Sequence, residues 1–323
     1  MLQRSRLFPP GISNRTLFLI LTLALAASLF FIFFFSPPSN FPRGIMVTVP
    51  EGLSVAEISS LFAEKHLVRS ATGLEYFIRY KSGIAMAGDY VFREPEAMPA
   101  IARRLVDGDY GIAPIKVTIP EGATADDIGN LIARQIPDFD AETFIAQAQP
   151  QEGYLFPDTY YFQPTWSIDR IIETLTKQFR TATKPLTPLL DHSGRTLEQV
   201  VIMASLVERE ARTTESRRLI AGILWKRLDA GMPLQVDAVF PYIVGRNTFE
   251  LSRKDLATSS PYNTYRYRGL PIGPIANPGL ASLTAALTPI ESDYWFYLSD
   301  RFGTFHYAVD FAEHKRNKAK YLP

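Results

Sequence analysis

This chain of 323 residues contains no cysteine and only four histidines. A cysteine-free sequence excludes a disulfide scaffold, a thiolate zinc site, an iron–sulfur cluster and a cysteine nucleophile. Four histidines give little support for a multi-histidine metal centre. We therefore expect no metal site.

The sequence also lacks an excess of charge of either sign. Its 34 lysines and arginines and 33 aspartates and glutamates leave a formal net charge of +1, whereas proteins that bind nucleic acids normally carry a basic excess or stripe. No Lys-Ser or Lys-Thr pair follows the glycines of its loop motifs, so a phosphate-binding loop is missing as well. We expect no nucleic-acid partner and no cofactor.

An unbroken uncharged and mostly apolar stretch runs from Leu17 to Phe35. As a helix it would be about 28 Å long, which matches the hydrocarbon core of a bilayer. A cleaved signal peptide would end in a small-residue site, whereas this stretch ends in phenylalanines followed by Ser36-Pro37-Pro38. The pattern predicts an uncleaved transmembrane helix over residues 17–35.

The charges that flank this stretch predict its orientation. Residues 1–16 contain Arg4, Arg6 and Arg15 and no acidic residue. The positive-inside rule then puts the N-terminus in the cytoplasm and the rest of the chain across the membrane. A proline-rich linker over residues 36–44 follows the helix.

An internal repeat begins after this linker. The segment Val47–Ile58 returns seventy residues later as Val117–Ile128. Each copy predicts a short strand, a Pro-Glu-Gly turn and a helix that is capped by Ser54 or Thr124. We interpret the copies as two small strand–helix units, each of which opens a separate module.

Apolar residues at helical spacing predict further helices in the first module, and Ala87–Phe92 predicts its closing strand. This β-α-α-β order with an extra helix resembles the LysM family of glycan-binding modules, whose opening pattern is met by Val47–Phe62. The alternative is a small packing domain that binds no ligand, because helix capping alone would explain the repeat.

One helix of the second module carries a candidate catalytic acid. Thr196 begins a capping box, and Glu208 falls on the apolar stripe that follows, whereas Glu210 lies about 200° further round the helix. Burying an acidic side chain on an apolar face is unfavourable unless its charge is paired or neutralised. Glu208 could form an ion pair with Arg212 or Arg217, or it could be a desolvated general acid with a raised pKa.

Six motifs then carry a family resemblance: Glu152–Tyr160, Ala204–Glu210, Leu234–Asp237, Tyr262–Tyr265, Gly269–Gly279 and Glu313-His314. They occur in the order that is typical of the endolytic murein transglycosylases of the YceG-like family, which the whole chain resembles. The resemblance implies a single-pass inner-membrane protein with a periplasmic catalytic domain. That domain would cleave nascent peptidoglycan strands between N-acetylmuramic acid and N-acetylglucosamine, leave 1,6-anhydro ends and so limit strand elongation.

The resemblance makes Glu208 the catalytic residue, because it is the first glutamate of the Ala-Ser-x-Val-Glu-x-Glu motif. One carboxyl group can suffice, since the muramic acid O6 hydroxyl replaces water as the nucleophile. We expect amide, aromatic and other polar side chains to bind the substrate or, alternatively, to brace loops. These candidates are Tyr154, Gln235, Asp237, Tyr262, Asn263, Tyr265, Asn277 and His314.

The chain departs from the family pattern in two places. Ala238-Val239-Phe240 stands where the family usually has Pro-Thr-Val, and Phe305 stands where it commonly has a histidine, with His306 one residue later. Both differences lie outside the motifs around Glu208 and Tyr262–Tyr265.

Two other functions compete with this prediction. The protein could be a non-catalytic scaffold that holds cell-wall synthases at nascent strands. It could also be a glycoside hydrolase, which would need a second carboxylate about 5–9 Å from Glu208. Asp237 or Glu210 would have to supply it, and helix geometry argues against Glu210.

The expected fold is α+β throughout. The predicted parts are a cytoplasmic N-terminus at 1–16, a transmembrane helix at 17–35, a linker at 36–44, a LysM-like β-α-α-β module at 45–112 and a mixed α/β transglycosylase domain at 113–323. Its expected partners are the cytoplasmic membrane, peptidoglycan strands and cell-wall synthases.

The charge bias predicts the topology. A reporter that is active only in the periplasm should be active when it is fused after Pro323, because the segment beyond the span has crossed the membrane. Activity of a cytoplasm-only reporter at the same position would contradict the orientation. A mature protein that begins near Ser36 would show that the span is cleaved.

Overall fold

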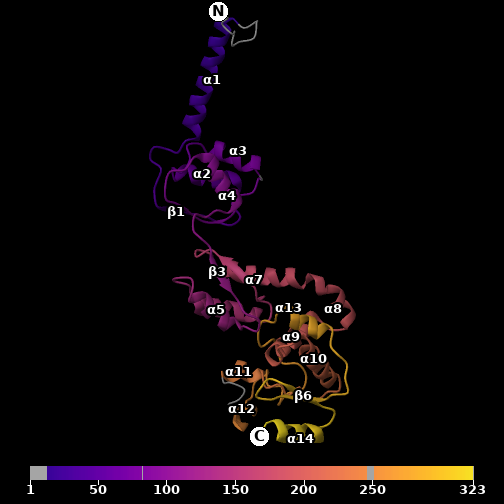
Figure 1. The fold of residues 1–323 in the computed structure, drawn as a ribbon. Helices are drawn as coiled ribbons and strands as arrows, with labels where there is room; N and C mark the ends of the chain where they lie inside the picture. The colour runs from indigo at the N-terminus through magenta and orange to yellow at the C-terminus, as the bar shows by residue number, and fades with distance from the viewer. Residues whose placement is uncertain (1–12, 82, 246–250, 323) are drawn as a thin grey trace, which may run out of the picture. The chain divides into compact units, whose positions relative to one another are not determined.

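The computed structural model describes residues 13–81, 83–245 and 251–322. They form a mostly helical structure with three small two-stranded antiparallel sheets, β1-β2, β3-β4 and β5-β6 (Figure 1). The chain divides into two units, Met1–Ala113 (unit 1) and Pro114–Pro323 (unit 2). The prediction of an α+β fold is confirmed at this level.

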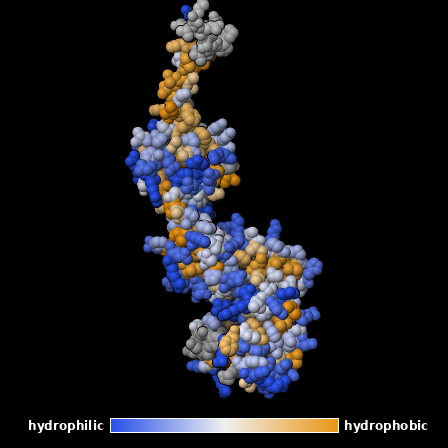
Figure 2. Space-filling model, in the orientation of Figure 1, coloured by the Kyte–Doolittle hydropathy of each residue, from blue (hydrophilic) through white to orange (hydrophobic). Residues whose placement is uncertain are grey.

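Unit 1 begins with the apolar helix α1 (Asn14–Phe35), which contains the predicted span. Within the described part of the chain, α1 alone is long and apolar enough to cross a membrane. Most of its described side chains are exposed, and its surface is orange for hydrophobic residues in Figure 2. The prediction based on Arg4 and Arg6 lies outside the described residues.

The rest of unit 1 surrounds one hydrophobic core. Its elements are β1 (Ile45–Val49), α2 (Val55–Glu64), α3 (Ala71–Lys81), β2 (Gly88–Phe92) and α4 (Met98–Asp107). Phe62, Leu74, Tyr90 and Phe92 are fully buried in this core. The buried Arg104 joins α4 to β2, because its Nη2 donates to the Val91 carbonyl over 2.9 Å.

The segment predicted as a linker belongs partly to this core. Phe41 is 8% exposed, and its ring lies edge-on to Phe92 at 6.2 Å between centroids. The Gly44 amide also donates to the Phe92 carbonyl over 2.8 Å. Only the few residues between Phe35 and Phe41 therefore separate the end of α1 from the core.

Unit 2 begins with a second copy of the same β-α-α-β plan. Its elements are β3 (Ile115–Thr118), α5 (Ala125–Ala133), α6 (Ala141–Ala148) and β4 (Thr159–Phe162). Val47 pairs with Tyr90 in the first sheet, and Val117 pairs with Tyr160 in the second. Every strand partner is thus shifted by the same seventy residues, so the repeat covers a whole unit rather than its opening segment.

The two copies also share their local hydrogen bonds. Capping boxes begin α2 at Ser54 and α5 at Thr124. The Tyr90 hydroxyl donates to the carbonyl of Met86 over 2.7 Å, and that of Tyr160 donates four residues back in the same way over 2.6 Å. The same sequence features therefore fix the same turns twice.

The remainder of unit 2 is helical apart from one hairpin. Its elements are α7 (Ile168–Thr183), α8 (Thr187–Ser193), α9 (Leu197–Glu210), α10 (Thr214–Asp229), α11 (Val239–Val244), α12 (Arg253–Leu256), α13 (Leu280–Leu287), β5 (Phe296–Ser299), β6 (Phe305–Ala308) and α14 (Phe311–Tyr321). All residues from Val200 to Val207 of α9 are buried. Because α10 and α13 pack against it, α9 is a central helix of this core.

Candidate active site

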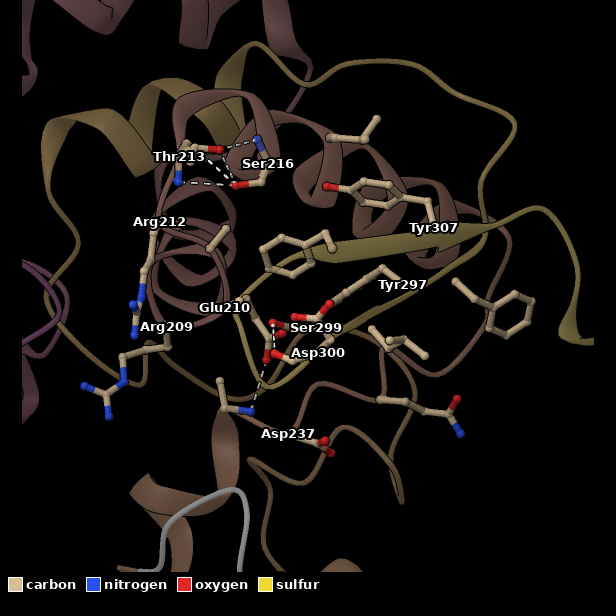
Figure 3. A pocket seen from close by; sticks show the side chains of 18 of the residues that line it. Arg209, Glu210, Arg212, Thr213, Ser216, Asp237, Tyr297, Ser299, Asp300 and Tyr307 are labelled. Atoms are coloured by element: carbon tan, nitrogen blue, oxygen red, sulfur yellow. Dashed lines mark hydrogen bonds between the residues drawn. The ribbon is translucent and has the colours of Figure 1, made fainter. Parts of the chain in front are cut away.

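A cavity of about 1400 Å³ opens at the C-terminal end of α9. Its walls come from α9, the start of α10, the 235–241 segment, the β5-β6 hairpin and α14 (Figure 3). Five of the predicted site residues line it: Glu208, Gln235, Asp237, Tyr265 and His314. The other four, Tyr154, Tyr262, Asn263 and Asn277, do not.

Glu208 is held by two strong contacts. Its side chain is 4% exposed, and Oε1 accepts a hydrogen bond from Arg217 Nη2 at 2.7 Å. Oε2 accepts from the backbone amide of Gly279, the N-cap residue of α13, at 2.9 Å. Of the two ion pairs that the sequence suggested, the pair with Arg217 is therefore present. Glu208 joins α9, α10 and α13 through one carboxylate.

Arg217 extends this network to the repeat unit. Its Nε donates to the Ala211 carbonyl at 3.1 Å, and its Nη2 lies 3.8 Å from the carboxylate of Glu121 in the second Pro-Glu-Gly turn. Glu121 packs so closely over Gly279 that a Cβ there would collide with it. The turn of the repeat therefore forms part of the cavity wall.

Glu210 is the second carboxyl group of the α9 motif, and it points into the cavity (Figure 3). Burial raises its pKa to about 7, and the negative charge of Asp237 adds to the effect. The Tyr297 hydroxyl and the Ala238 amide donate to the carboxyl group, the latter at 3.3 Å, and partly offset the rise.

Helix geometry predicts that Glu210 points away from the site, and this prediction is wrong. Glu210 is the last residue of α9, and Glu208 and Glu210 line the same cavity. At a helix end, the neighbouring loop and hairpin can enclose side chains on several faces, so the apolar stripe no longer decides which side chain is buried.

Asp237 and Gln235 lie on a segment that is fixed by Thr264. The Gln235 and Val236 amides donate to the Thr264 carbonyl and hydroxyl at 3.2 and 3.0 Å. Gln235 adopts a positive φ of 52°, an unusual conformation for a residue other than glycine. The Tyr265 hydroxyl donates to Asp237 Oδ1 at 2.5 Å, so the carboxylate is oriented at the cavity wall.

Asn277 is fully buried, and its side chain has no hydrogen-bonding capacity left for a sugar. Its Nδ2 donates to the Ala123 carbonyl and to Glu152 Oε1, at 2.9 and 2.6 Å. Its Oδ1 accepts from the Gly153 and Leu155 amides at 2.8 and 2.9 Å. Asn277 therefore joins the repeat unit to the segment before α13, and it has no free group for binding substrate.

Asn263 has a similar position in a different loop. It is 1% exposed, and its Nδ2 donates to the Leu256 and Thr258 carbonyls at 3.0 and 2.8 Å. Its Oδ1 accepts from the backbone amides of Tyr265 and Arg266 at 3.0 and 3.3 Å. The amide thus braces the loop that carries Tyr265.

The two tyrosines outside the cavity pack against other rings. Tyr154 lies edge-on to Phe179 at 5.0 Å between ring centroids, and Tyr262 lies 5.0 Å from Tyr242. Both support the core around α9. Their predicted stacking on sugar rings is not supported by these positions.

His314 lines the cavity from α14 and stacks on Phe296 at 5.3 Å between centroids. Burial lowers its pKa, and the nearby positive charge of Arg227 lowers it further. His306, by contrast, pairs with Asp300 at 3.0 Å and stacks on Tyr321 at 3.5 Å. His306 therefore braces the β5-β6 hairpin against α14.

Several residues that line the cavity were not predicted from the sequence. Tyr297 comes from β5, and its side chain points towards Glu210 in Figure 3. The same view shows the long side chains of Arg209 and Arg212 at one edge of the site. The Glu-Arg-Glu-Ala-Arg sequence at residues 208–212 could have indicated the two arginines, because it lies where a helix ends in a short turn. In the part of the chain that the structure describes, no three His, Asp or Glu side chains gather as a metal site requires.

Comparison with known proteins shows which family this chain is similar to. The YceG-like family matches residues 47–320. The endolytic murein transglycosylase of Bacillus subtilis is 32% identical over 306 residues, which cover 86% of this chain and 85% of that protein. The protein of the same name from Streptococcus pneumoniae is 28% identical over 88% of this chain and 59% of its own length. A crystal structure of a yceG-like protein from Listeria monocytogenes is 29% identical, with a TM-score of 0.57 over 85% of this chain and 99% of that one.

Glu152 makes the stability of unit 2 depend on pH. Its carboxyl group accepts from the Ala125 amide and from Asn277, and burial raises its pKa from 4.5 to about 7. The folded state therefore binds more protons than the unfolded state between these values, so stability is lost as pH rises through this window. The full effect corresponds to roughly 3 kcal/mol.

We expect Glu152→Gln to flatten the dependence of the unfolding free energy on pH between 5 and 8. All three tryptophans lie in unit 2, so their fluorescence during urea unfolding reports on this unit. Part of the slope should remain, because Glu210 titrates in the same window. Glu142→Gln, an exposed carboxyl on α6, is the matched control and should leave the slope unchanged. An unchanged slope in Glu152→Gln would contradict the assignment.

Proposed function

This chain belongs to the YceG-like family, and we propose that it is a membrane-anchored lytic transglycosylase that cleaves peptidoglycan glycan strands internally. The observation that carries the proposal is the carboxyl group of Glu210 in a large cavity, with its pKa raised to about 7 and with Asp237 beside it. A neutral carboxyl at physiological pH is what a general acid requires.

In the proposed reaction, the Glu210 carboxyl group donates its proton to the oxygen of the glycosidic bond. The bond between that oxygen and the muramic acid C1 breaks, and positive charge develops on C1 and the ring oxygen. The carboxylate then accepts the proton of the O6 hydroxyl while O6 attacks C1. The products are a 1,6-anhydro-muramic end and a free hydroxyl on the N-acetylglucosamine, and no water is consumed.

The surroundings of Glu210 suit both steps. Tyr297 hydrogen-bonds to the carboxyl group and can orient it while its proton moves. The carboxylate of Asp237, oriented by Tyr265, supplies negative charge near the positive charge that develops on the sugar. Gln235 and His314 line the same cavity and are candidates for binding acetamido and hydroxyl groups.

We favour Glu210 over Glu208 as this acid and base. Glu208 bonds to Arg217 through Oε1 and to the Gly279 amide through Oε2, so both of its oxygens are already engaged within the protein. Breaking such a buried pair also costs several kcal/mol, so in this proposal Glu208 holds the site together.

The proposed location and partners of the protein depend on helix α1. We propose that α1 is an uncleaved span of the cell inner membrane, with the cytoplasmic N-terminus and periplasmic catalytic unit that the charge bias predicts. The LysM-like order of unit 1 supports a role in holding glycan strands. Cell-wall synthases, which make these strands, are the proposed protein partners, and cleavage near them would limit strand elongation.

A two-carboxylate hydrolase is the second candidate. The observation that favours it is the electrostatic effect of Asp237 on Glu210, because hydrolases place two carboxyl groups around one glycosidic bond. The products distinguish the two reactions: hydrolysis adds one water and leaves reducing ends, whereas transglycosylation leaves anhydro ends.

Glu208→Gln and Glu210→Gln form a matched pair that tests the acid. We expect Glu210→Gln to keep its fold and to lose about 10²–10⁴-fold in turnover. Glu208→Gln should instead lower the melting temperature, with a loss of activity in proportion to the folded fraction. Mass spectrometry of products from purified glycan strands, with melting curves on the same preparations, measures both. A well-folded Glu208→Gln protein without activity, beside an active Glu210→Gln protein, would return the catalytic role to Glu208.

The raised pKa also predicts the pH profile. The acid must be protonated in the free enzyme, and the Glu210 pKa is about 7, so kcat/KM should fall above this pH by about tenfold per pH unit. Steady-state rates of anhydro-end formation between pH 5 and 9 measure the profile. A flat profile up to pH 9 would show that the proton donor is another group.

A further inference from the structure

We propose that one face of unit 1 lies in the headgroup region of the same bilayer that α1 crosses. This face, here called the tyrosine face, consists of Tyr76 and Tyr80 on α3 and the basic end of that helix. The inference rests on the proposed function in one respect, because it requires α1 to be an uncleaved span.

The end of α1 is packed directly against α3. The Phe35 ring, at the last residue of α1, lies edge-on to Phe77 of α3 at 5.3 Å between centroids. Arg69, just before α3, places its guanidinium 4.9 Å from the Phe33 ring and donates to the Pro37 carbonyl at 3.1 Å. The start and the middle of α3 therefore lie at the level where α1 leaves the bilayer.

The chain between the two elements is too short to carry unit 1 away from the membrane. Phe35 ends the span, and Phe41 is already buried in the core of unit 1. A few extended residues reach at most about 3.5 Å each. Unit 1 is therefore held close to the bilayer surface, and one of its faces must point towards it.

The two tyrosines on α3 are unusually exposed for this unit. Tyr76 and Tyr80 are 67% and 80% exposed, whereas Tyr90 and Tyr110 are buried in the core. They lie one helical turn apart, and their rings stack at 6.4 Å between centroids with an interplanar angle of 15°. Tyrosine is enriched where membrane meets water, because its ring is apolar and its hydroxyl is polar. Such a pair beside the end of a span is typical of an interfacial anchor.

Charge on the same helix fits the surface of a membrane. Arg79 and Lys81 form its last turn, and Arg69 precedes it. Glu75 is the only acidic residue between Arg69 and Lys81, and it pairs with Arg79 at 2.8 Å. The segment keeps a net positive charge, which is attracted to anionic lipid headgroups on the side of the membrane where unit 1 lies.

A bilayer is a better occupant of this face than a protein or a sugar strand. Phe77 links the tyrosines to the end of the span, since its ring contacts Phe35 and lies 6.1 Å from Tyr76. The tyrosine face therefore continues the apolar surface of α1 rather than standing apart from it. Anything else on this face would have to share the space with lipid headgroups.

Fluorescent labels on introduced cysteines can test this proposal. Because the protein has no cysteine of its own, each variant carries its label at a single position. Lys81→Cys, labelled with a fluorophore, puts a probe next to Tyr80 while both tyrosines remain. The full-length protein is placed in lipid nanodiscs that contain a lipid with a quencher on its headgroup. Glu51→Cys is the matched control, because it is exposed and follows β1, which Figure 1 shows at a different edge of unit 1 from α3.

We expect quenching of the label at residue 81 to be at least twofold stronger than at residue 51. The double change Tyr76→Ser/Tyr80→Ser should reduce it by half or more, and these exposed positions can change without unfolding the unit. Equal quenching at residues 81 and 51, or quenching that the serines do not alter, would overturn the proposal.

A third label separates this proposal from the proposed anchor. Ile20→Cys lies in α1 and should be quenched by a lipid with a quencher deep in its acyl chain. Quenching at residue 20 without quenching at residue 81 would refute the tyrosine face and leave the anchor intact. Loss of quenching at residue 20 would refute the anchor itself.

Discussion

The structure of unit 2 depends on how the short segment from Asn277 to Gly279 is held. Asn277 bonds to the repeat unit through its whole side-chain amide and through its backbone, which exchanges hydrogen bonds with Gly122 and Ala123. Two residues later, the Gly279 amide donates to Glu208. The first contact fixes the segment to the β-α-α-β unit, and the second fixes it to the end of α9. Together the two contacts join the β-α-α-β unit to the end of α9 through three residues.

The two carboxyl groups at the end of α9, Glu208 and Glu210, are only two residues apart but have very different surroundings. An arginine and a backbone amide compensate the charge of Glu208. Glu210 instead meets a second acid and a tyrosine, and burial disfavours its ionised form. Glu208 is therefore part of the scaffold, since both of its oxygens bond within the protein, while the proposed reaction uses Glu210, whose ionisation burial disfavours.

Local features of the fold could be predicted from the sequence, and long-range ones could not. Capping boxes gave the starts of α2, α5 and α9, because they depend on residues three apart. The surroundings of Glu210 depend on Tyr297, which reaches it from a hairpin more than eighty residues later. The amides of Asn263 and Asn277 could equally have faced a sugar or a loop. Only the path of the distant backbone decides which donors and acceptors surround them.

The duplicated β-α-α-β unit also creates a problem of folding fidelity. β1 can accept β4 in place of β2, because Val47 would meet Tyr160, a residue of the same type as its native partner. The helices resist this exchange. Phe62 on α2 is buried with Leu74 on α3, whereas Ile132 on α5 is buried with Phe144 on α6. A mixed unit would bring two phenylalanines together in one core and leave the other core underfilled. Side-chain volume, rather than strand pairing, therefore keeps each half of the duplication with its own partner.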